Sequence, residues 1–120
     1  MRLGIVILPE HRWPVARDVW RRAEQLGLDH AWTYDHLAWC TLRDAPWFGA
    51  VPTLAAAATI TSRIRLGPLV ASPNFRHPVS FARELITLDE VSGATRRRSS
   101  TSSRARSESI TDRGDQSGEG

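Results

Sequence analysis

The apolar residues of this chain alternate between two spacings, and this alternation constrains the fold more than any other feature. Leu3 to Leu8 is a short continuous apolar run, the pattern of a strand buried on both faces of a parallel sheet. The next segment changes to helical spacing. Pro14 is tolerated in the first turn of a helix, and Gly27 would end it. The predicted apolar face of this amphipathic helix consists of Val15, Val19, Ala23 and Leu26.

The same alternation continues as far as Gly93. The stretch "DHAWTYDH" predicts a second strand, the run from Leu54 to Ile60 a second helix, and Ile64 to about Ala71 a third strand. A third helix is expected to open at Pro78 and to end at Ser92 and Gly93. The resulting order, β-α-β-α-β-α, predicts an α/β fold of parallel strands joined by right-handed crossovers, with every strand's carboxyl end at one edge.

Three polar loops follow the predicted strands: "PEHRW", "DHLAWC" and "SPNFRHP". Ligands bind at this edge in doubly wound sheets and in (β/α)₈ barrels, so these loops are the candidate site. Asp35 and His36 end the second strand, and a histidine beside a carboxylate can act as an acid or base near neutral pH. An exposed loop histidine or a helix cap is the alternative. The loop after the third strand could equally be a plain surface turn, because Pro and Asn favour turns anywhere.

Two further groups of side chains lie near the same predicted edge. A metal site could draw on His11, His36, Cys40 and His77. We expect no metal, because this spacing matches no known ligand motif. The first two loops are flanked by Trp13, Trp32, Trp39 and Trp47. These rings would serve either as core and rim aromatics or as the lining of a site for a flat ligand.

Composition and missing motifs argue against several classes of protein. The first strand is not followed by the G-x-G-x-x-G of a dinucleotide-binding fold, and no G-x-S-x-G nucleophile elbow is present. Ten arginines against nine acidic residues up to Gly93 leave no evident basic patch, so nucleic acid is not an expected partner. The single cysteine, Cys40, fits a reducing cytoplasm. The apolar run before Pro9 is too short for a signal peptide, and no stretch approaches the roughly 20 apolar residues of a membrane span.

Two stretches carry a resemblance to a known family. The segments "TYDHL" and "RIRLGPLVASPNFRHPVSFARELITLDEVSG" resemble the N-terminal third of the luciferase-like monooxygenase superfamily, in particular its deazaflavin (coenzyme F420)-dependent oxidoreductases. The resemblance covers Arg2 to Gly93. It implies the N-terminal portion of a (β/α)₈ TIM barrel that binds F420, or alternatively FMN, at the carboxyl ends of its strands. The implied activity is hydride transfer to or from a small organic substrate, or flavin-dependent monooxygenation, and full-length members are often homo-oligomers.

The resemblance also implies roles for five residues. Asp35 matches an aspartate that contacts the cofactor, and His36 matches the histidine that serves as acid or base in F420-dependent members. Leu69 and Val70 fall where the family has a non-proline cis peptide, a bulge that supports the middle ring of the cofactor. Ser72 matches a cofactor-contacting hydroxyl residue. The change from apolar strand to polar loop would then place the strand behind the ring and polar groups at its edge.

The resemblance ends at Gly93. Members of the family continue with Gly-Arg and a fourth apolar strand, whereas residues 94–120 are rich in arginine and serine and have no strand or helix periodicity. We expect a partial barrel domain over residues 1–93 and a disordered tail over 94–120, and a frameshift near Gly93 is one hypothesis for the change. Because a complete barrel has about 250 residues, such a chain would expose apolar surface and bind cofactor weakly. The alternatives are an inactive remnant of such an enzyme and a small binding module with a basic tail.

Overall fold

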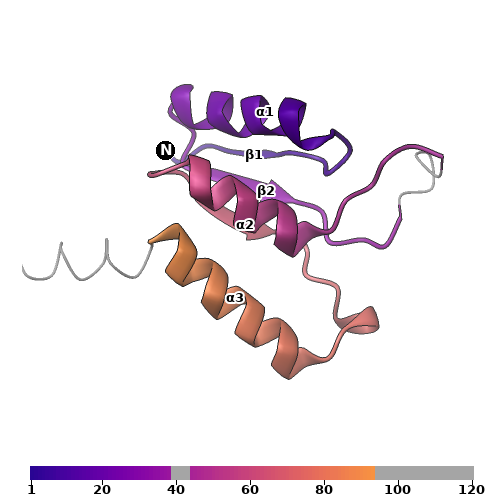
Figure 1. The fold of residues 1–120 in the computed structure, drawn as a ribbon. Coiled ribbons are helices and arrows are strands. Elements are labelled where there is room, and N and C mark those ends of the chain that lie inside the picture. Colours follow the sequence, from indigo (N-terminus) through magenta and orange to yellow (C-terminus); the bar gives the residue numbers. More distant parts are fainter. Residues whose placement is uncertain (39–43, 94–120) are drawn as a thin grey trace, which may run out of the picture.

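The computed structural model describes residues 1–38 and 44–93, so the predicted tail lies outside the described residues. Strands and helices alternate along these residues, which confirms the predicted β-α-β-α-β-α order (Figure 1). A short 3₁₀ helix, η2 (Pro73–Phe75), precedes the last helix. The elements are β1 (Gly4–Val6), α1 (Trp13–Gln25), β2 (His30–Thr33), α2 (Ala50–Ile60), β3 (Arg65–Pro68) and α3 (Pro78–Ser92).

The three strands form one parallel sheet in the order β1-β2-β3. The predicted third strand was too long, because β3 ends at Pro68 and not near Ala71. The amide of Leu69 still donates to the carbonyl oxygen of Thr33, at 2.8 Å, but Thr33 is the last residue of β2. Beyond this point, the described residues provide no further strand for β3 to pair with. Helix α2 begins at Ala50, before the predicted Leu54, since Pro52 is tolerated in its first turn.

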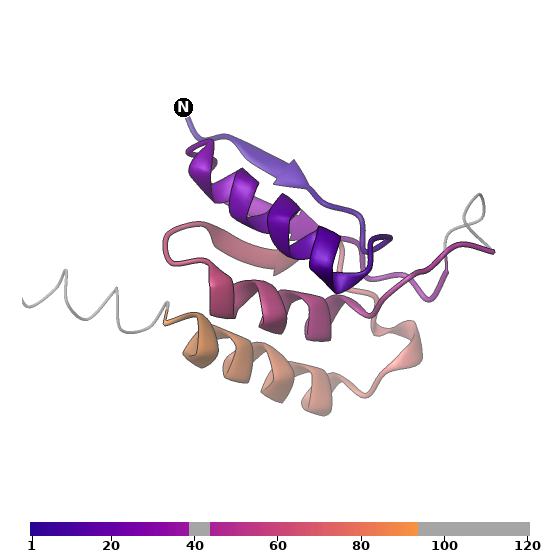
Figure 2. The ribbon, with the colours of Figure 1, turned by 45° about the horizontal axis from the view of Figure 1, so that its top comes forward.

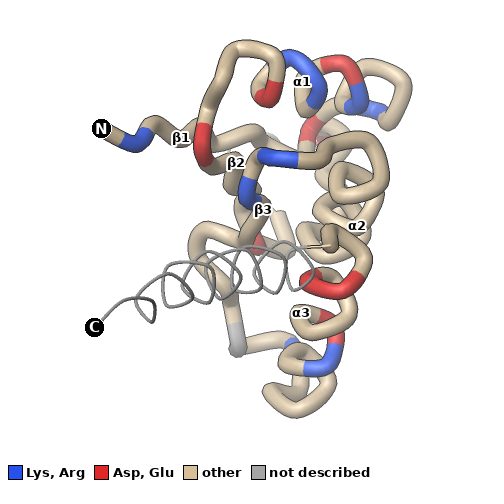
Figure 3. Tube along the Cα trace, turned by 90° about the vertical axis from the view of Figure 1, so that its left-hand side faces the viewer, with Lys and Arg blue, Asp and Glu red and all other residues tan. Residues whose placement is uncertain are grey.

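All three helices lie on the same face of the sheet (Figures 1 and 2), and the view along the sheet in Figure 3 shows strands on one side and helices on the other. The prediction that the first strand is buried on both faces was therefore wrong. Ile5 and Val6 in β1 are both exposed, because within the described residues β1 is an edge strand and the helices cover one face of the sheet only.

The core lies between this covered face and the helices. The largest fully buried apolar side chains are Trp20 in α1 and Leu54 in α2. The predicted apolar face of α1 was only partly right: Ala23 is buried, but Val15 and Leu26 are exposed. The helix instead buries a stripe centred on Trp20 and flanked by small residues, which lets it approach the sheet closely. The buried apolar cluster consists of Ile7, Ala16, Trp20, Ala23, Ala31, Leu54, Ala57, Ala58, Ile64 and Leu88.

The uncovered face of the sheet carries an aromatic pair. The ring of Trp32 in β2 stacks on that of His30, with centroids 5.8 Å apart and planes 14° from parallel. The indole also lies across Gly67 in β3, where an added Cβ would come within 2.7 Å of Trp32 Cζ3. Glycine at this position is therefore what allows the Trp32 ring to lie flat on the sheet.

Candidate functional site

The carboxyl ends of the three strands are tied together by buried hydrogen bonds. The hydroxyl of Thr33, at the end of β2, donates to the carbonyl oxygen of Ile7 after β1, at 2.8 Å. The carbonyl oxygen of Thr33 accepts from Leu69 after β3. The loops that follow the strands consequently start from one edge, as parallel pairing predicts.

Asp35 joins the loop after β2 to the loop after β3. Its side chain is 2% exposed. One carboxylate oxygen, Oδ2, accepts from the backbone amide of Ser72 at 2.7 Å, and the other, Oδ1, accepts from the guanidinium of Arg76. The structure thus brings together two of the predicted site residues, Asp35 and Ser72, which are 37 positions apart in the chain.

Arg76 is a residue of this site that the sequence analysis missed. Its guanidinium lies over the rings of Phe75, at 4.8 Å, and Phe81, at 4.5 Å, and Nη1 is 4.0 Å from a carboxylate oxygen of Glu84. Aromatic faces attract a cation of this kind. A signal was available: a buried aspartate needs a cationic or hydrogen-bonding partner, and Arg76 is the arginine of the polar "SPNFRHP" loop.

His36 follows Asp35, and its side chain is exposed. Its ring meets that of Tyr34 edge-on, with centroids 5.5 Å apart and planes at 87°. The carbonyl oxygen of His36 accepts from the indole N–H of Trp47 at 2.8 Å, so the loop before α2 fastens the backbone here. The backbone of His36 is therefore held by Trp47, and that of the preceding residue by the hydrogen bonds of Asp35.

Leu69 and Val70, which directly follow β3, are the candidate apolar wall of the site. The peptide bond between them is cis, as the resemblance implies, which confirms that part of the prediction. Their side chains are 40% and 65% exposed, respectively. Ser72 follows two residues later and is half-buried. An exposed apolar pair thus lies beside a polar loop at the edge where His36 also emerges. The proposed contacts of these residues with a cofactor remain predictions.

The tryptophans do not form one cluster around the site. Trp32 lies on the open sheet face and Trp47 contacts the backbone of His36, while Trp13 lines a separate pocket of about 270 Å³ between the starts of α1 and α2. Trp39 and Cys40 lie outside the described residues.

Within residues 1–38 and 44–93, no group of three or more His, Cys, Asp or Glu side chains is placed to hold a metal ion.

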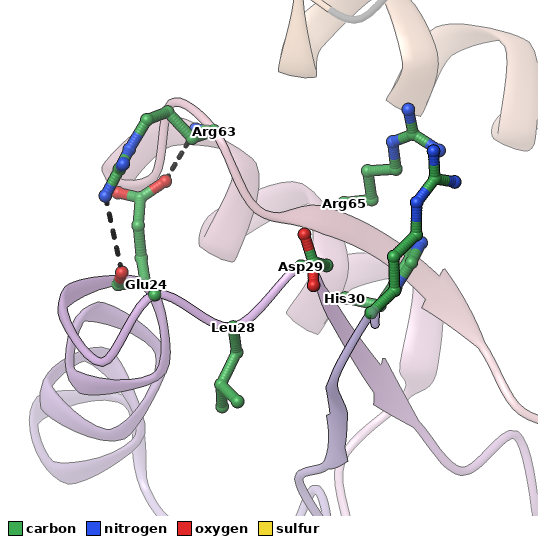
Figure 4. Close-up of a pocket in the computed structure, with 8 residues that line it drawn as sticks. Glu24, Leu28, Asp29, His30, Arg63 and Arg65 are labelled. Atoms are coloured by element: carbon green, nitrogen blue, oxygen red, sulfur yellow. Dashed lines mark hydrogen bonds between the residues drawn. The ribbon is translucent and has the colours of Figure 1, made fainter.

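The opposite edge of the sheet contains a polar pocket of about 290 Å³ (Figure 4). Here Oε1 of Glu24, at the end of α1, accepts from three consecutive backbone amides, those of Ser62, Arg63 and Ile64, at 2.8, 2.6 and 3.1 Å. Burial raises the pKa of Glu24, but these hydrogen bonds and the nearby Arg63 guanidinium outweigh it and leave the pKa below its ordinary value. This carboxylate anchors the turn that starts β3, so we assign the edge a structural role.

Comparison with known proteins agrees with this architecture. The family model of the luciferase-like monooxygenases matches residues 1–94. The chain belongs to the luciferase-like monooxygenase family. A relative in this family, the 5,10-methylenetetrahydromethanopterin reductase of Methanopyrus kandleri, is 36% identical over 90 residues, which are 75% of this chain and 24% of the relative. The F420-dependent glucose-6-phosphate dehydrogenase of Amycolatopsis mediterranei is 38% identical over 74 residues, 59% of this chain and 22% of the relative.

A solved structure of this family is also similar. The coenzyme F420-dependent tetrahydromethanopterin reductase from Methanopyrus kandleri superimposes with a TM-score of 0.66 at 34% identity, over 77% of this chain and 24% of that one. This likeness confirms the predicted fold class, the N-terminal portion of a (β/α)₈ barrel. The chain spans about a quarter of the length of these family members. In the part that the structure describes, no helix is long and apolar enough to cross a membrane.

Proposed function

We propose that this chain forms the cofactor-facing N-terminal portion of an F420-dependent oxidoreductase that acts on a small organic substrate. The observation that carries the proposal is the junction of Asp35 and Ser72, which holds the loops after β2 and β3 together at the carboxyl edge of the sheet. The names of the similar proteins support F420 as the cofactor. The single cysteine, Cys40, is in keeping with a reducing cytoplasm as its location.

The residues at this edge fit a planar ring with a polar rim. Leu69 and Val70 offer exposed apolar surface, against which one face of a flat ring can pack. The exposed imidazole of His36 can hold a proton at one nitrogen and give or accept it at the edge of that surface. When bound, F420 supplies a hydride to the substrate or takes one from it. The role of this chain is to orient the ring, to shield one of its faces, and to give or accept the accompanying proton.

Cofactor titration of the full chain tests the proposal. F420 fluorescence is followed as the chain is added, with FMN titrated in parallel because a flavin-dependent monooxygenase would prefer FMN. We expect saturable but weak binding of F420, with half-saturation above the micromolar range, because the three strands of the described residues provide only one wall of a barrel site. Tight micromolar binding to a folded monomer would contradict the partial-site argument, and stronger binding of FMN would contradict the choice of cofactor.

The location of the site is tested by placing a charge on the apolar wall and, as a control, at a similarly exposed position elsewhere. Val70→Asp should weaken F420 binding by about tenfold or more, because a carboxylate would lose hydration beneath the ring. Leu26→Asp is the control, since Leu26 at the far end of α1 is similarly exposed, 63% against 65% for Val70. Equal effects of the two substitutions would refute the location of the site.

A further inference from the structure

The carboxylate of Asp35 is enclosed by groups of its own chain. Oδ2 accepts from the Ser72 amide and Oδ1 from the Arg76 guanidinium, and the side chain is 2% exposed. A buried charge is stable only when it is paired and hydrogen-bonded, so these two partners account for the burial of Asp35. Little of the carboxylate surface is left for direct contact with a ligand.

Arg76, the partner of Asp35, is itself held in place by other side chains. Its side chain is 19% exposed and contacts two aromatic rings, that of Phe75 in η2 and that of Phe81 in the first turn of α3. Its Nε atom is buried and has no hydrogen-bond partner among the described residues. The guanidinium thus donates to Asp35 and lies in ion-pair range of Glu84, and it connects three segments: the loop after β2, η2 and α3.

We propose that Arg76 is a positioning residue which, through Asp35, fixes the two loops of the candidate cofactor site relative to one another. Asp35 directly precedes His36, and Ser72 follows Val70 by two residues, so the Arg76–Asp35–Ser72 connection sets the separation of the imidazole from the apolar wall. On this proposal, Asp35 acts on the cofactor indirectly, as the anchor of the loops. The consequence for binding rests on the proposed function; the consequence for the loops does not.

The loop arrangement is tested by amide hydrogen exchange of Ser72 in the isotope-labelled full chain. Arg76→Gln should accelerate the exchange by about tenfold or more, the change expected when a hydrogen bond to a charged group is loosened. Removing one partner of a buried pair can unfold a protein, so Asp35→Asn with Arg76→Gln, which leaves no buried charge unpaired, is measured beside Asp35→Asn alone, and the difference between the two is the part due to Arg76. Arg83→Gln in α3 is the control, because Arg83 has no ion pair among the described residues. Equal Ser72 exchange with and without Arg76→Gln, both in the wild type and beside Asp35→Asn, would overturn the proposal.

The same variants are then titrated with F420. We expect the double variant to bind about tenfold more weakly than the wild type, while Arg76→Lys, which keeps the charge but not the flat stacking surface, recovers part of the affinity. Faster Ser72 exchange with unchanged F420 affinity would overturn the positioning role. If the wild-type chain binds no F420, the proposed function fails, and the exchange measurement still decides whether Arg76 fixes the loops.

Discussion

Replacing Glu24 by glutamine removes a charge from the turn that starts β3. One carboxylate oxygen of Glu24 accepts three backbone amides, from Ser62, Arg63 and Ile64. Glutamine keeps a carbonyl oxygen at this position, but hydrogen bonds to a charged acceptor are roughly twice as strong as neutral ones. The first two of these bonds lie near the surface, where water competes. We therefore expect Glu24→Gln to lower the free energy of unfolding by about 1–2 kcal/mol in total.

The effect should depend on pH in a defined direction. The pKa of Glu24 in the folded chain lies below its ordinary value of 4.5, so the carboxylate stabilises the fold fully above that value. The stabilisation is lost as the pH falls through the lowered pKa, because the protonated group has the same charge as glutamine. The difference between wild type and variant should thus be largest near neutral pH and should shrink well below about pH 4.

Urea unfolding followed by circular dichroism measures both quantities. Wild type and Glu24→Gln are compared at about pH 7 and at a series of lower pH values, down to the lowest at which the wild type still folds. The control is Glu90→Gln, an exposed glutamate of α3, which should change the unfolding free energy by less than about 0.5 kcal/mol. A Glu24 effect as small as that of the control, or one that does not shrink anywhere in the acid series, would refute the role assigned to this carboxylate.

Two further substitutions test the packing on the two faces of the sheet. Gly67→Ala would place a Cβ 2.7 Å from Trp32 Cζ3, so it should destabilise the fold by about 1–3 kcal/mol and shift tryptophan fluorescence. Gly49→Ala, whose nearest contact would be an ordinary 3.4 Å, should do neither, and equal effects would contradict the placement of Trp32. Leu54→Ala empties a fully buried position and should cost about 2–5 kcal/mol in urea unfolding. An effect no larger than that of the exposed Ile86→Ala would show that the helix layer is packed differently.

The order of strands and helices could be predicted because each element is specified by residues close together in the sequence. The apolar run of β1, the first-turn Pro14 of α1 and Gly93 after α3 each specify a local conformation. The face of α1 was harder to predict. Helical spacing of apolar residues predicted that Val15 and Leu26 would be buried. The helix instead packs on the sheet through Trp20 and alanines.

Some features of the candidate site could be predicted from the sequence and others could not. The cis peptide between Leu69 and Val70 was predicted from the resemblance, since it lies within one recognisable stretch. The ion pair of Asp35 and Arg76 joins residues 41 positions apart and depends on two loops folding against each other. No local spacing encodes such a pair. Burial of β1 on both faces was also mispredicted, because burial depends on what covers the far face of the sheet.

The most direct test of the central claim is to map F420 onto the chain by nuclear magnetic resonance. Backbone amide shifts of the labelled full chain are followed as F420 is added in excess, which detects weak binding and locates it. We predict that the perturbed amides concentrate at His36, at Leu69 and Val70, and at Ser72. Shifts centred instead on the opposite edge, around Glu24 and Arg63, or no saturable shifts at all, would contradict the assignment of the carboxyl edge as the cofactor site.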